Sequence, residues 1–452
     1  MKYSYLLMAG LLLSYSCTMK DTEKYPVELI TLDPGHFHAA LVQKTSYPDV
    51  NPVVHVYAPE GADLDEHLKK IEAYNTRADN PTKWEEIVYA KPDFLEVMLR
   101  DKKGNVMVTS GNNGKKTEYI RRTLLGGINV LADKPMAINS DGFETLKQCF
   151  DIASKNGLLL YDIMTERFEI TTILQKEFSR IESVFGKQLA GTPEDPGIVK
   201  ESVHHFFKVV SGNPLIRPAW FFDVNQQGEG LVDVTTHLVD LVQWECFPEQ
   251  IIDYKKDIEI IDANRWTTSI SPTQFKEVTG LAEYPDYLKK DVVDDTLRVY
   301  SNGNIFYKIR DVNAKVSVIW NYTYPEGGGD THYSVMRGSR ANLIIEQGAA
   351  QNYQPELYIE SAADGFEADL SAAISSVSAK YPGIEPKKIA DGKWQIIVPA
   401  KYRNGHEAHF GQVTENFLKY LKDGSIPAWE VPNMLAKYYV TTQALEMAKG
   451  KQ

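Results

Sequence analysis

The sequence predicts an α/β protein in which an N-terminal doubly wound, mostly parallel sheet precedes a C-terminal α+β domain with a large open antiparallel sheet. Short apolar strands alternate with amphipathic helices across residues 27–165, a pattern typical of parallel strands joined by helices. Beyond residue 165, long strand-like runs follow one another with turn residues between them, as in an antiparallel sheet covered on one face. A chain of 452 residues is also long for one domain, and about two to three are expected.

The first domain is assigned to residues 27–165. Strands are expected at 27–32, 52–58, 129–132 and 158–163, helices at 36–44, 66–74, 117–125 and 141–155, and further apolar segments at 94–99 and 106–109. Gly126 and Gly157 follow the last two of these helices, where glycine commonly ends a helix.

The second domain is assigned to residues 166–452. Strand-like runs occupy residues 204–210, 251–261, 296–300, 304–310, 315–322 and 343–346. Residues around 350–404 are less regular, and we expect an inserted hairpin or subdomain there. Two amphipathic helices, at 406–422 and 434–449, are expected to close the chain.

The first residues resemble an export signal. Lys2 gives a positive start, residues 5–13 are apolar, and small residues stand just before Cys17. Residues 1–17 are therefore expected to be a lipoprotein signal with Cys17 as the lipidated residue, or else a plain cleaved signal peptide, and residues 18–26 a polar tether. The apolar run is too short to span a bilayer. The expected location is the periplasm or the outer membrane of a bacterium, with a lipid anchor in the membrane.

Composition limits the other classes of function. Hydrophobic content of 43% and charged content of 24% describe an ordinary globular protein. The net charge of -12, without a cluster of Lys and Arg, argues against a nucleic-acid partner. Only three cysteines are present, which excludes a disulfide framework and a cysteine-rich zinc site.

Residues 228–240, GEGLVDVTTHLVD, carry ionisable groups about one helical turn apart, a spacing that suits acid–base catalysis. If a helix follows the glycines, Asp233, His237 and Asp240 fall at i, i+4 and i+7 and share one face. A histidine with a carboxylate one turn away is a general base with an orienting partner. The alternative is a buried polar cluster that caps loops.

The turn after the first strand is where the pyrophosphate of a dinucleotide would meet a helix N-terminus. This turn reads DPGHFH and keeps only the middle glycine of G-x-G-x-x-G, as Gly35. Asp33 stands at the first glycine and would repel a pyrophosphate, and His38 stands at the third. Glu60, just past the second strand, is the nearest acidic candidate for a ribose hydroxyl.

His36 and His38 also suggest a metal. Two histidines without a third ligand nearby more often pack or cap a loop, so the sequence predicts no metal site.

Lys134 lies at the carboxyl end of a predicted strand. Its ammonium can therefore point into the cleft at the carboxyl edge of the predicted parallel sheet, where a dinucleotide would bind. Its context, GGINVLADKPMA, resembles the E-K-P signature of the glucose-fructose oxidoreductase / inositol dehydrogenase / MocA family. The stretch GNNGKKTEYIRRTLLGG places Asn113 at that family's asparagine after its fourth strand, and WFFDVNQQGEGLVDVTTHLVDL resembles its G-G-G-x-x-x-D-x-G-x-H-x-x-D segment.

The resemblance implies a Rossmann-like first domain, NAD or NADP as the cofactor, a sugar or related polyol as the substrate, and a homo-oligomer. Lys134 would contact the substrate hydroxyl and help to place the nicotinamide, while His237, paired with Asp233, would take the hydroxyl proton. The implied or candidate cofactor contacts are Asp33, Gly35, His36, Phe37, His38, Glu60, Asn113, Asp133 and Lys134. The candidate substrate contacts are Arg167, Trp220, Asp240 and His332.

Departures from the family pattern put cofactor affinity, and the choice between NAD and NADP, in doubt. The glycine loop is replaced by DPGHFH, Asp133 replaces the family's glutamate, and Lys116 stands where many members have histidine.

Three functions remain open from the sequence. The first is a dehydrogenase acting on a sugar or glycoside hydroxyl, such as C3 of a glucoside. The second is a hydrolase or lyase that oxidises C3 transiently with a tightly held NAD. The third is a lipid-anchored carbohydrate-binding protein without a cofactor, although retention of Lys134, Asp233 and His237 argues against it.

Overall fold

The first domain of the computed structural model is a six-stranded parallel sheet in the order β3-β2-β1-β4-β5-β6. The model describes residues 26–210 and 213–451, so Cys17, the signal of residues 1–17 and nearly all of the tether lie outside the described residues. The strands are β1 (Leu29–Leu32), β2 (Val53–Ala58), β3 (Glu85–Ala90), β4 (Val106–Thr109), β5 (Asn129–Asp133) and β6 (Leu160–Ile163). The predicted doubly wound sheet is confirmed.

Five helices connect these strands: α1 (His38–Leu41), α2 (Ala62–Thr76), α3 (Phe94–Asp101), α4 (Asn113–Leu125) and α5 (Ser140–Asn156). At α5, the side chain of Asn139 accepts a hydrogen bond from the Gly142 N–H at 2.7 Å, and Gly157 ends the helix at a φ of 65°. Strand β3 was missed because it is an edge strand of half-exposed residues that opens with two glutamates.

The second domain is built on a ten-stranded sheet in the order β10-β12-β13-β7-β14-β15-β16-β18-β17, with β11 paired to β12. Its strands are β7 (Ile198–His205), β10 (Ile258–Ile270), β11 (Val292–Val293), β12 (Thr296–Ile309), β13 (Val312–Asn321), β14 (Thr331–Arg337), β15 (Asn342–Gln347), β16 (Glu356–Glu360), β17 (Glu385–Ala390) and β18 (Lys393–Ile397). A separate small hairpin joins β8 (Val209–Val210) to β9 (Asn213–Pro214). The predicted antiparallel sheet is confirmed except at β7 and β13, which run parallel.

The helical segments around this sheet are η2 (Thr165–Phe168), α6 (Ile170–Ser179), α7 (Glu182–Phe185), η3 (Ala219–Phe222), α8 (Val224–Gln227), α9 (Thr235–Cys246), α10 (Pro272–Thr279), η4 (Asp286–Asp291), η5 (Ala349–Gln351), α11 (Phe366–Lys380), η6 (Ala400–Tyr402), α12 (His406–Asp423) and α13 (Glu430–Lys449). Residues 350–404 form α11 with β16, β17 and β18, and these strands extend the main sheet.

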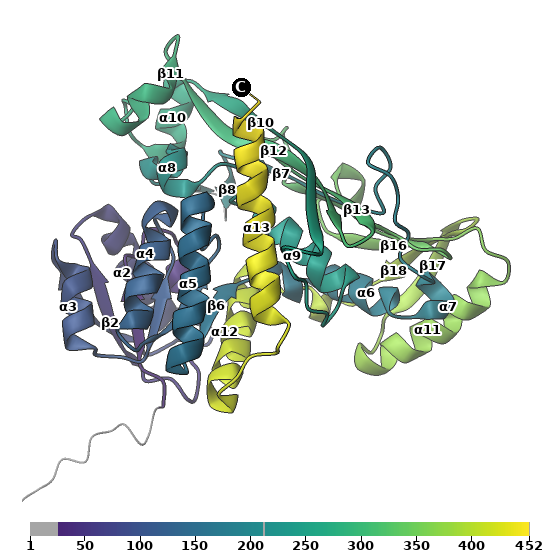
Figure 1. Cartoon of the computed structure of the whole chain (residues 1–452), viewed down its shortest axis with the longest axis horizontal. Helices are drawn as coiled ribbons and strands as arrows, with labels where there is room; N and C mark the ends of the chain where they lie inside the picture. The colour runs from purple at the N-terminus through teal and green to yellow at the C-terminus, as the bar shows by residue number, and fades with distance from the viewer. Residues whose placement is uncertain (1–25, 211–212, 452) are drawn as a thin grey trace, which may run out of the picture.

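The last two helices return to the first domain. Figure 1 shows α13 running between the two sheets. Phe410 and Phe417 of α12 and Tyr438 of α13 pack in the core of the first domain. Val440 and Leu445, about half a turn and two turns further along α13, pack in the core under the large sheet. The end of the chain therefore completes both cores.

The two domains are also joined by buried charges. The Arg167 guanidinium of η2 binds both carboxylate oxygens of Asp240 of α9 at 2.7 Å and contacts Glu430 of α13 at 3.0 Å. The Lys437 ammonium of α13 lies 2.9 Å from Asp240 and 2.7 Å from Asp162 of β6. Burial alone would raise the pKa of Asp240, but Arg167 and Lys437 hold that pKa well below its usual value. We call these five side chains the junction network.

The structure places Arg167 and Asp240 in the domain junction, and not where their sequence-based role as substrate contacts requires them. Asp240 is 2% exposed and Arg167 is 7% exposed, and neither lines a cavity described below. Their charges neutralise each other inside the domain junction.

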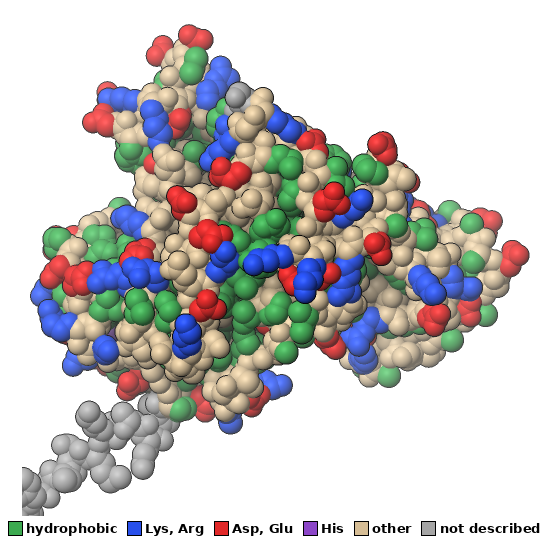
Figure 2. All heavy atoms as spheres, in the orientation of Figure 1, with side chains coloured by type: hydrophobic (Ala, Val, Ile, Leu, Met, Phe, Trp, Pro, Cys, Tyr) green, Lys and Arg blue, Asp and Glu red, His purple; other side chains and the backbone are tan. Residues whose placement is uncertain are grey.

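In the described part of the chain, no helix has the length and apolar character needed to cross a membrane. Figure 2 shows acidic and basic side chains interspersed over one face of the molecule rather than a broad basic field.

Replacing Asp240 with alanine should destabilise the protein by about 3–5 kcal/mol, because Arg167 and Lys437 would keep buried charges without their shared partner. Guanidinium denaturation of the full chain measures this. The control is Glu66→Ala, which removes an exposed pair with Lys69 on α2 and should change stability by less than about 0.5 kcal/mol. Equal small effects for both variants would contradict the structural role of the network.

Candidate functional site

A cavity of about 680 Å³, called the large cavity below, lies where the carboxyl ends of β1, β4 and β5 face α9 and the large sheet. Residues of both domains line it. From the first domain come His36, Phe37, His38, Asn113, Asp133 and Lys134, and from the second Arg217, Phe221, Gln227, Asp233, His237, Leu238, Trp320, Asp330 and His332. The carboxyl edge of a parallel sheet is the usual place for a ligand site.

Lys134 and Asp233 form an ion pair in this cavity. The Lys134 Nζ lies 2.7 Å from Asp233 Oδ1, and the Gln227 side chain donates to the other oxygen at 3.0 Å. Burial acts to lower the pKa of Lys134, but the carboxylates of Asp233 and Asp133 outweigh it and raise that pKa above its usual value. Lys134 is therefore an ammonium at neutral pH.

The predicted pairing of Asp233 with His237 on one helix face is wrong. Helix α9 begins at Thr235, so Asp233 lies in the preceding turn and its carboxylate points to Lys134. That turn is fixed by Gly230, where a Cβ atom would lie only 2.0 Å from the Ser301 carbonyl oxygen of β12. The close approach of two backbones holds the turn out of the helix.

His237 still lines the cavity, without an orienting carboxylate. Its Nδ1 is buried and has no hydrogen-bond partner within the described chain. Burial, and then the charges near it beginning with Lys134, hold the pKa of His237 well below its usual value. The ring is therefore a neutral imidazole at pH 7 and can accept a proton.

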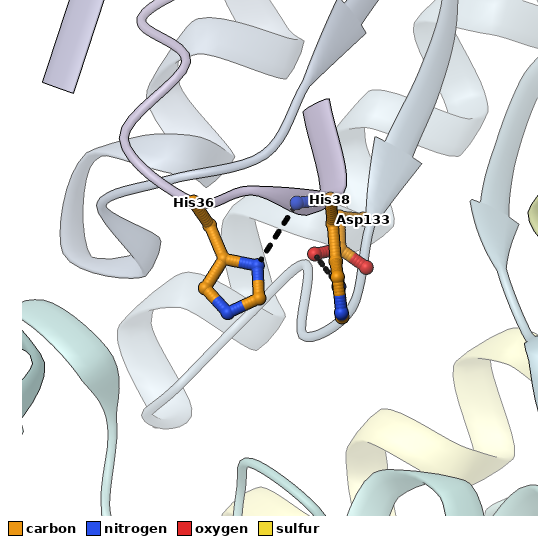
Figure 3. A group of neighbouring side chains, drawn as sticks. All are labelled: His36, His38 and Asp133. Atoms are coloured by element: carbon orange, nitrogen blue, oxygen red, sulfur yellow. Dashed lines mark hydrogen bonds and ion pairs between the residues drawn. The ribbon is translucent and has the colours of Figure 1, made fainter. Parts of the chain in front are cut away.

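The segment after β1 contributes His36, Phe37 and His38 to the cavity wall. Figure 3 shows the side chains of His36 and His38 with that of Asp133. His38 Nδ1 lies 3.0 Å from Asp133 Oδ2, and the His38 N–H donates to His36 Nδ1 at 3.3 Å. Asp33, at the position of the first glycine in the motif, has a φ of 48°, the left-handed region that glycine usually fills.

Asn113 and Lys116 fix the end of β5 beside the cavity. The Lys116 ammonium donates to the Asp133 carbonyl oxygen at 2.8 Å and to Asn113 Oδ1 at 2.5 Å. Asn113 in turn donates to the Gln227 carbonyl oxygen at 2.7 Å, which ties α4 to the second domain. Burial lowers the pKa of Lys116 to about 8.

A smaller cavity of about 250 Å³ lies on the other side of Gly35 and is lined by Asp33, Glu60 and Asp63. Trp220 is not in the large cavity, where its sequence-based role as a sugar contact required it. Its Nε1 donates to Asp63 at 2.9 Å, and a Cβ atom on Gly35 would lie 3.3 Å from its ring. Trp220 therefore covers the backbone between the two cavities.

His332 lies in the large cavity, as a substrate contact requires, but on β14 rather than on a mobile loop. Burial lowers its pKa to about 3. Sequence reasoning missed Asp330, which lies 3.3 Å from His204 Nδ1 and also contacts Lys208. It also missed Arg217 and Glu166, which line the same cavity. Burial raises the pKa of Glu166 to about 7. Arg217 and Asp330 stand in loops and Glu166 stands in the short helix η2, and no spacing pattern links them, so the sequence carried no signal for them.

The comparisons with known proteins agree with this architecture. A family model described as "Putative oxidoreductase C terminal domain" matches residues 174–449. The chain belongs to this oxidoreductase family. No curated protein matches the chain.

Among solved structures, a "putative oxidoreductase" from Parabacteroides merdae ATCC 43184 is similar with 68% identity, 94% of this chain and 98% of that chain covered, and a TM-score of 0.93. A "putative oxidoreductase" from Thermotoga maritima shares the fold at 11% identity and a TM-score of 0.60, with 94% and 99% of the two chains covered. A 3-ketoreductase from Actinomadura kijaniata, solved with NADP and TDP-benzene, shares it at 13% identity and a TM-score of 0.56, with 92% and 95% covered. The resemblance to the glucose-fructose oxidoreductase family is thus supported at the level of an oxidoreductase with this fold.

Asp233→Asn should lower the pKa of Lys134, because burial then acts on the ammonium without its nearest opposing charge. At pH 8 a larger fraction of Lys134 would be neutral, and acetic anhydride should label it at least about tenfold faster than in the parent protein. Peptide mass spectrometry measures the labelling rate. Exposed Lys69 is the internal control and should react equally in both proteins; an unchanged Lys134 rate would show that Asp233 does not hold the proton there.

Proposed function

We propose that this chain is a nicotinamide-dependent oxidoreductase that oxidises a hydroxyl-bearing carbon of a sugar or glycoside, with C3 of a glucoside as the first candidate. One observation carries the proposal. A charged Lys134, held by Asp233, and a neutral His237 meet in one cavity at the carboxyl edge of a parallel sheet. The structural neighbour with a 3-ketoreductase activity supports the same class of reaction.

The residues present fit a dinucleotide. His36 lines the large cavity and Pro34 lines the smaller one, so the two cavities meet the chain on either side of Gly35, against which Asp63 and Trp220 are packed. His36, Phe37, Asn113 and Lys134 would hold the nicotinamide half, and the carboxylates of the smaller cavity would accept hydrogen bonds from a ribose. When bound, this cofactor supplies the hydride acceptor.

The backbone of the loop after β1 offers the cofactor fewer free N–H donors than a glycine-rich motif does. The Gly35 N–H donates to the Asp33 carbonyl oxygen at 2.8 Å, and the His36 N–H donates to the Ser110 carbonyl oxygen at 3.1 Å. These donors are occupied within the protein, so binding of the dinucleotide would depend more on the two cavities than on the loop.

The protein side of the reaction is positioning and proton transfer. The Lys134 ammonium can donate a hydrogen bond to the substrate hydroxyl oxygen and so favour its deprotonation, while Asp233 holds the ammonium in place. Neutral His237 can take the hydroxyl proton. The apolar walls of Phe221, Leu238 and Trp320 exclude water and suit the faces of a sugar ring.

His237→Gln and Lys134→Met should each lower kcat on the glycoside substrate by about 10²–10⁴-fold, the usual effect of removing a positioned acid or base. Equilibrium dialysis should show the His237→Gln variant still binding the nucleotide. His55→Gln is a matched control on β2, outside both cavities, where His55 bonds Tyr89.

The same assay separates the alternatives. Accumulation of reduced nucleotide supports net oxidation, while glycoside cleavage without it identifies the redox-neutral hydrolase or lyase. Failure to bind NAD or NADP at any concentration would overturn both enzymatic functions and leave the carbohydrate-binding protein.

We further propose NAD rather than NADP. The smaller cavity is lined by Asp33, Glu60 and Asp63, and no lysine or arginine is among its described lining residues. A 2′-phosphate would meet like charges there.

The parent protein should bind NAD at least about tenfold more tightly than NADP, and Glu60→Arg should reduce or reverse that ratio because it adds a positive charge and removes a negative one. Isothermal titration of both nucleotides into both proteins measures the ratio. Asp65→Arg, a control on α2 outside the lining residues, should leave it unchanged. A parent protein that prefers NADP would contradict this assignment of the smaller cavity.

Export, a lipid anchor at Cys17 and self-association remain proposals. The export signal rests on residues 1–17 of the sequence. For self-association, the exposed aromatic side chains of Trp266 and Tyr333 on the large sheet offer apolar area to a second copy.

A further inference from the structure

The fold brings together three metal-ligating side chains that are far apart in the sequence. His36 stands on the loop after β1, His38 is the first residue of α1, and Asp133 stands at the end of β5 (Figure 3). One donor atom from each lies within 4.8 Å of the others. The sequence offered two histidines without a third ligand, which is why no metal was predicted. The parallel pairing of β1 with β4, and of β4 with β5, supplies the missing carboxylate.

We propose that His36, His38 and Asp133 bind one divalent first-row transition metal ion, at the wall of the large cavity. Two imidazoles and one carboxylate are a common ligand set for Zn²⁺, Fe²⁺ and Mn²⁺, and they leave coordination positions open for an oxygen ligand. All three residues line the large cavity, so the open positions would face the space where a hydroxylated substrate fits. This inference goes beyond the proposed function and does not require it.

The distances need only a small adjustment. A bond length of about 2.1 Å places two opposite donors at most about 4.2 Å apart around one ion. His38 Nδ1 and Asp133 Oδ2 are already 3.0 Å apart. The His36 Nδ1 accepts one hydrogen bond, from the His38 N–H at 3.3 Å, so a rotation of this partly buried side chain can close the site.

The neighbouring lysines leave the Asp133 carboxylate available to a metal ion. Lys134 is neutralised by Asp233 at 2.7 Å, and Lys116 binds the Asp133 carbonyl oxygen rather than its carboxylate. Ser110 Oγ donates to Asp133 Oδ2 at 2.8 Å. A hydrogen bond of this kind orients a ligating carboxylate and supports metal affinity.

The competing explanation is that the His38 and Asp133 contact is only a structural hydrogen bond. It accounts for two of the three side chains. The third, His36, accepts the His38 N–H and packs its ring edge to face against His38, with centroids 4.1 Å apart, so metal titration is what separates the two explanations.

The test uses the purified full chain, stripped with a chelator, dialysed and titrated with Co²⁺ alone in the absence of nucleotide. We expect one Co²⁺ per chain, with the visible absorption of a site of low coordination number, and displacement of Co²⁺ by Zn²⁺. His36→Ala and His38→Ala should each weaken binding by at least about 100-fold, since even an outer hydrogen bond to a ligand contributes about 10–100-fold. Circular dichroism verifies that each variant is folded.

His332→Ala is the matched control, because His332 lines the same cavity outside the three-residue group; it should bind Co²⁺ like the parent protein. Absence of stoichiometric binding by the parent protein overturns the proposal, and so does parent-like affinity in folded His36→Ala. If Asp133→Asn fails to fold, the two histidine variants decide the question. Since no nucleotide is present, this outcome is independent of whether the protein binds NAD.

Discussion

The junction network is the constraint on which the rest of the structure depends. Asp240 accepts from Arg167 and Lys437 at the same time, so one carboxylate of α9 is shared by η2 and α13. Lys437 also binds Asp162, the end of the first-domain sheet. Ion pairs this deeply buried require nearly fixed geometry, because every charge must keep its partners. The network therefore fixes α9 relative to β6, the neighbour of β5, and so constrains how Asp233, just before α9, meets Lys134, just after β5.

The site that results belongs to neither domain alone. Lys134 comes from the carboxyl end of a parallel strand, Asp233 from a turn pressed against β12, and His237 from the first turn of α9. Hydrogen bonds from Asn113 to the backbone of Gln227 close the remaining side. Such a composite site brings a proton acceptor from one domain and an ammonium from the other into one cavity.

The sequence was sufficient for the fold class, because alternating strands and helices and long uninterrupted strand runs are local patterns. It was also sufficient to place Lys134, His237 and His332 in one cavity, through the resemblance for the first two. The sequence was insufficient where contacts between distant parts of the backbone determine the position of a side chain. The spacing of Asp233 and His237 suggests a shared helix face, but contact between Gly230 and Ser301 keeps residue 233 outside the helix. Arg167 and Asp240 looked like cleft residues because nothing local showed that Asp240 would be shared between Arg167 and Lys437, which is almost 200 positions away from it.

The position of α12 and α13 has a consequence for how the protein is made. Phe410, Phe417 and Tyr438 are core residues of a domain whose first strand begins some 380 residues earlier. Contacts of such long sequence separation form late and slowly. The N-terminal half of the nascent chain therefore emerges from the ribosome with an apolar edge that stays uncovered until nearly the last codon has been translated. Synthesis of this protein demands that its first domain be kept from aggregating, by slow folding or by chaperones, until its own C-terminus arrives.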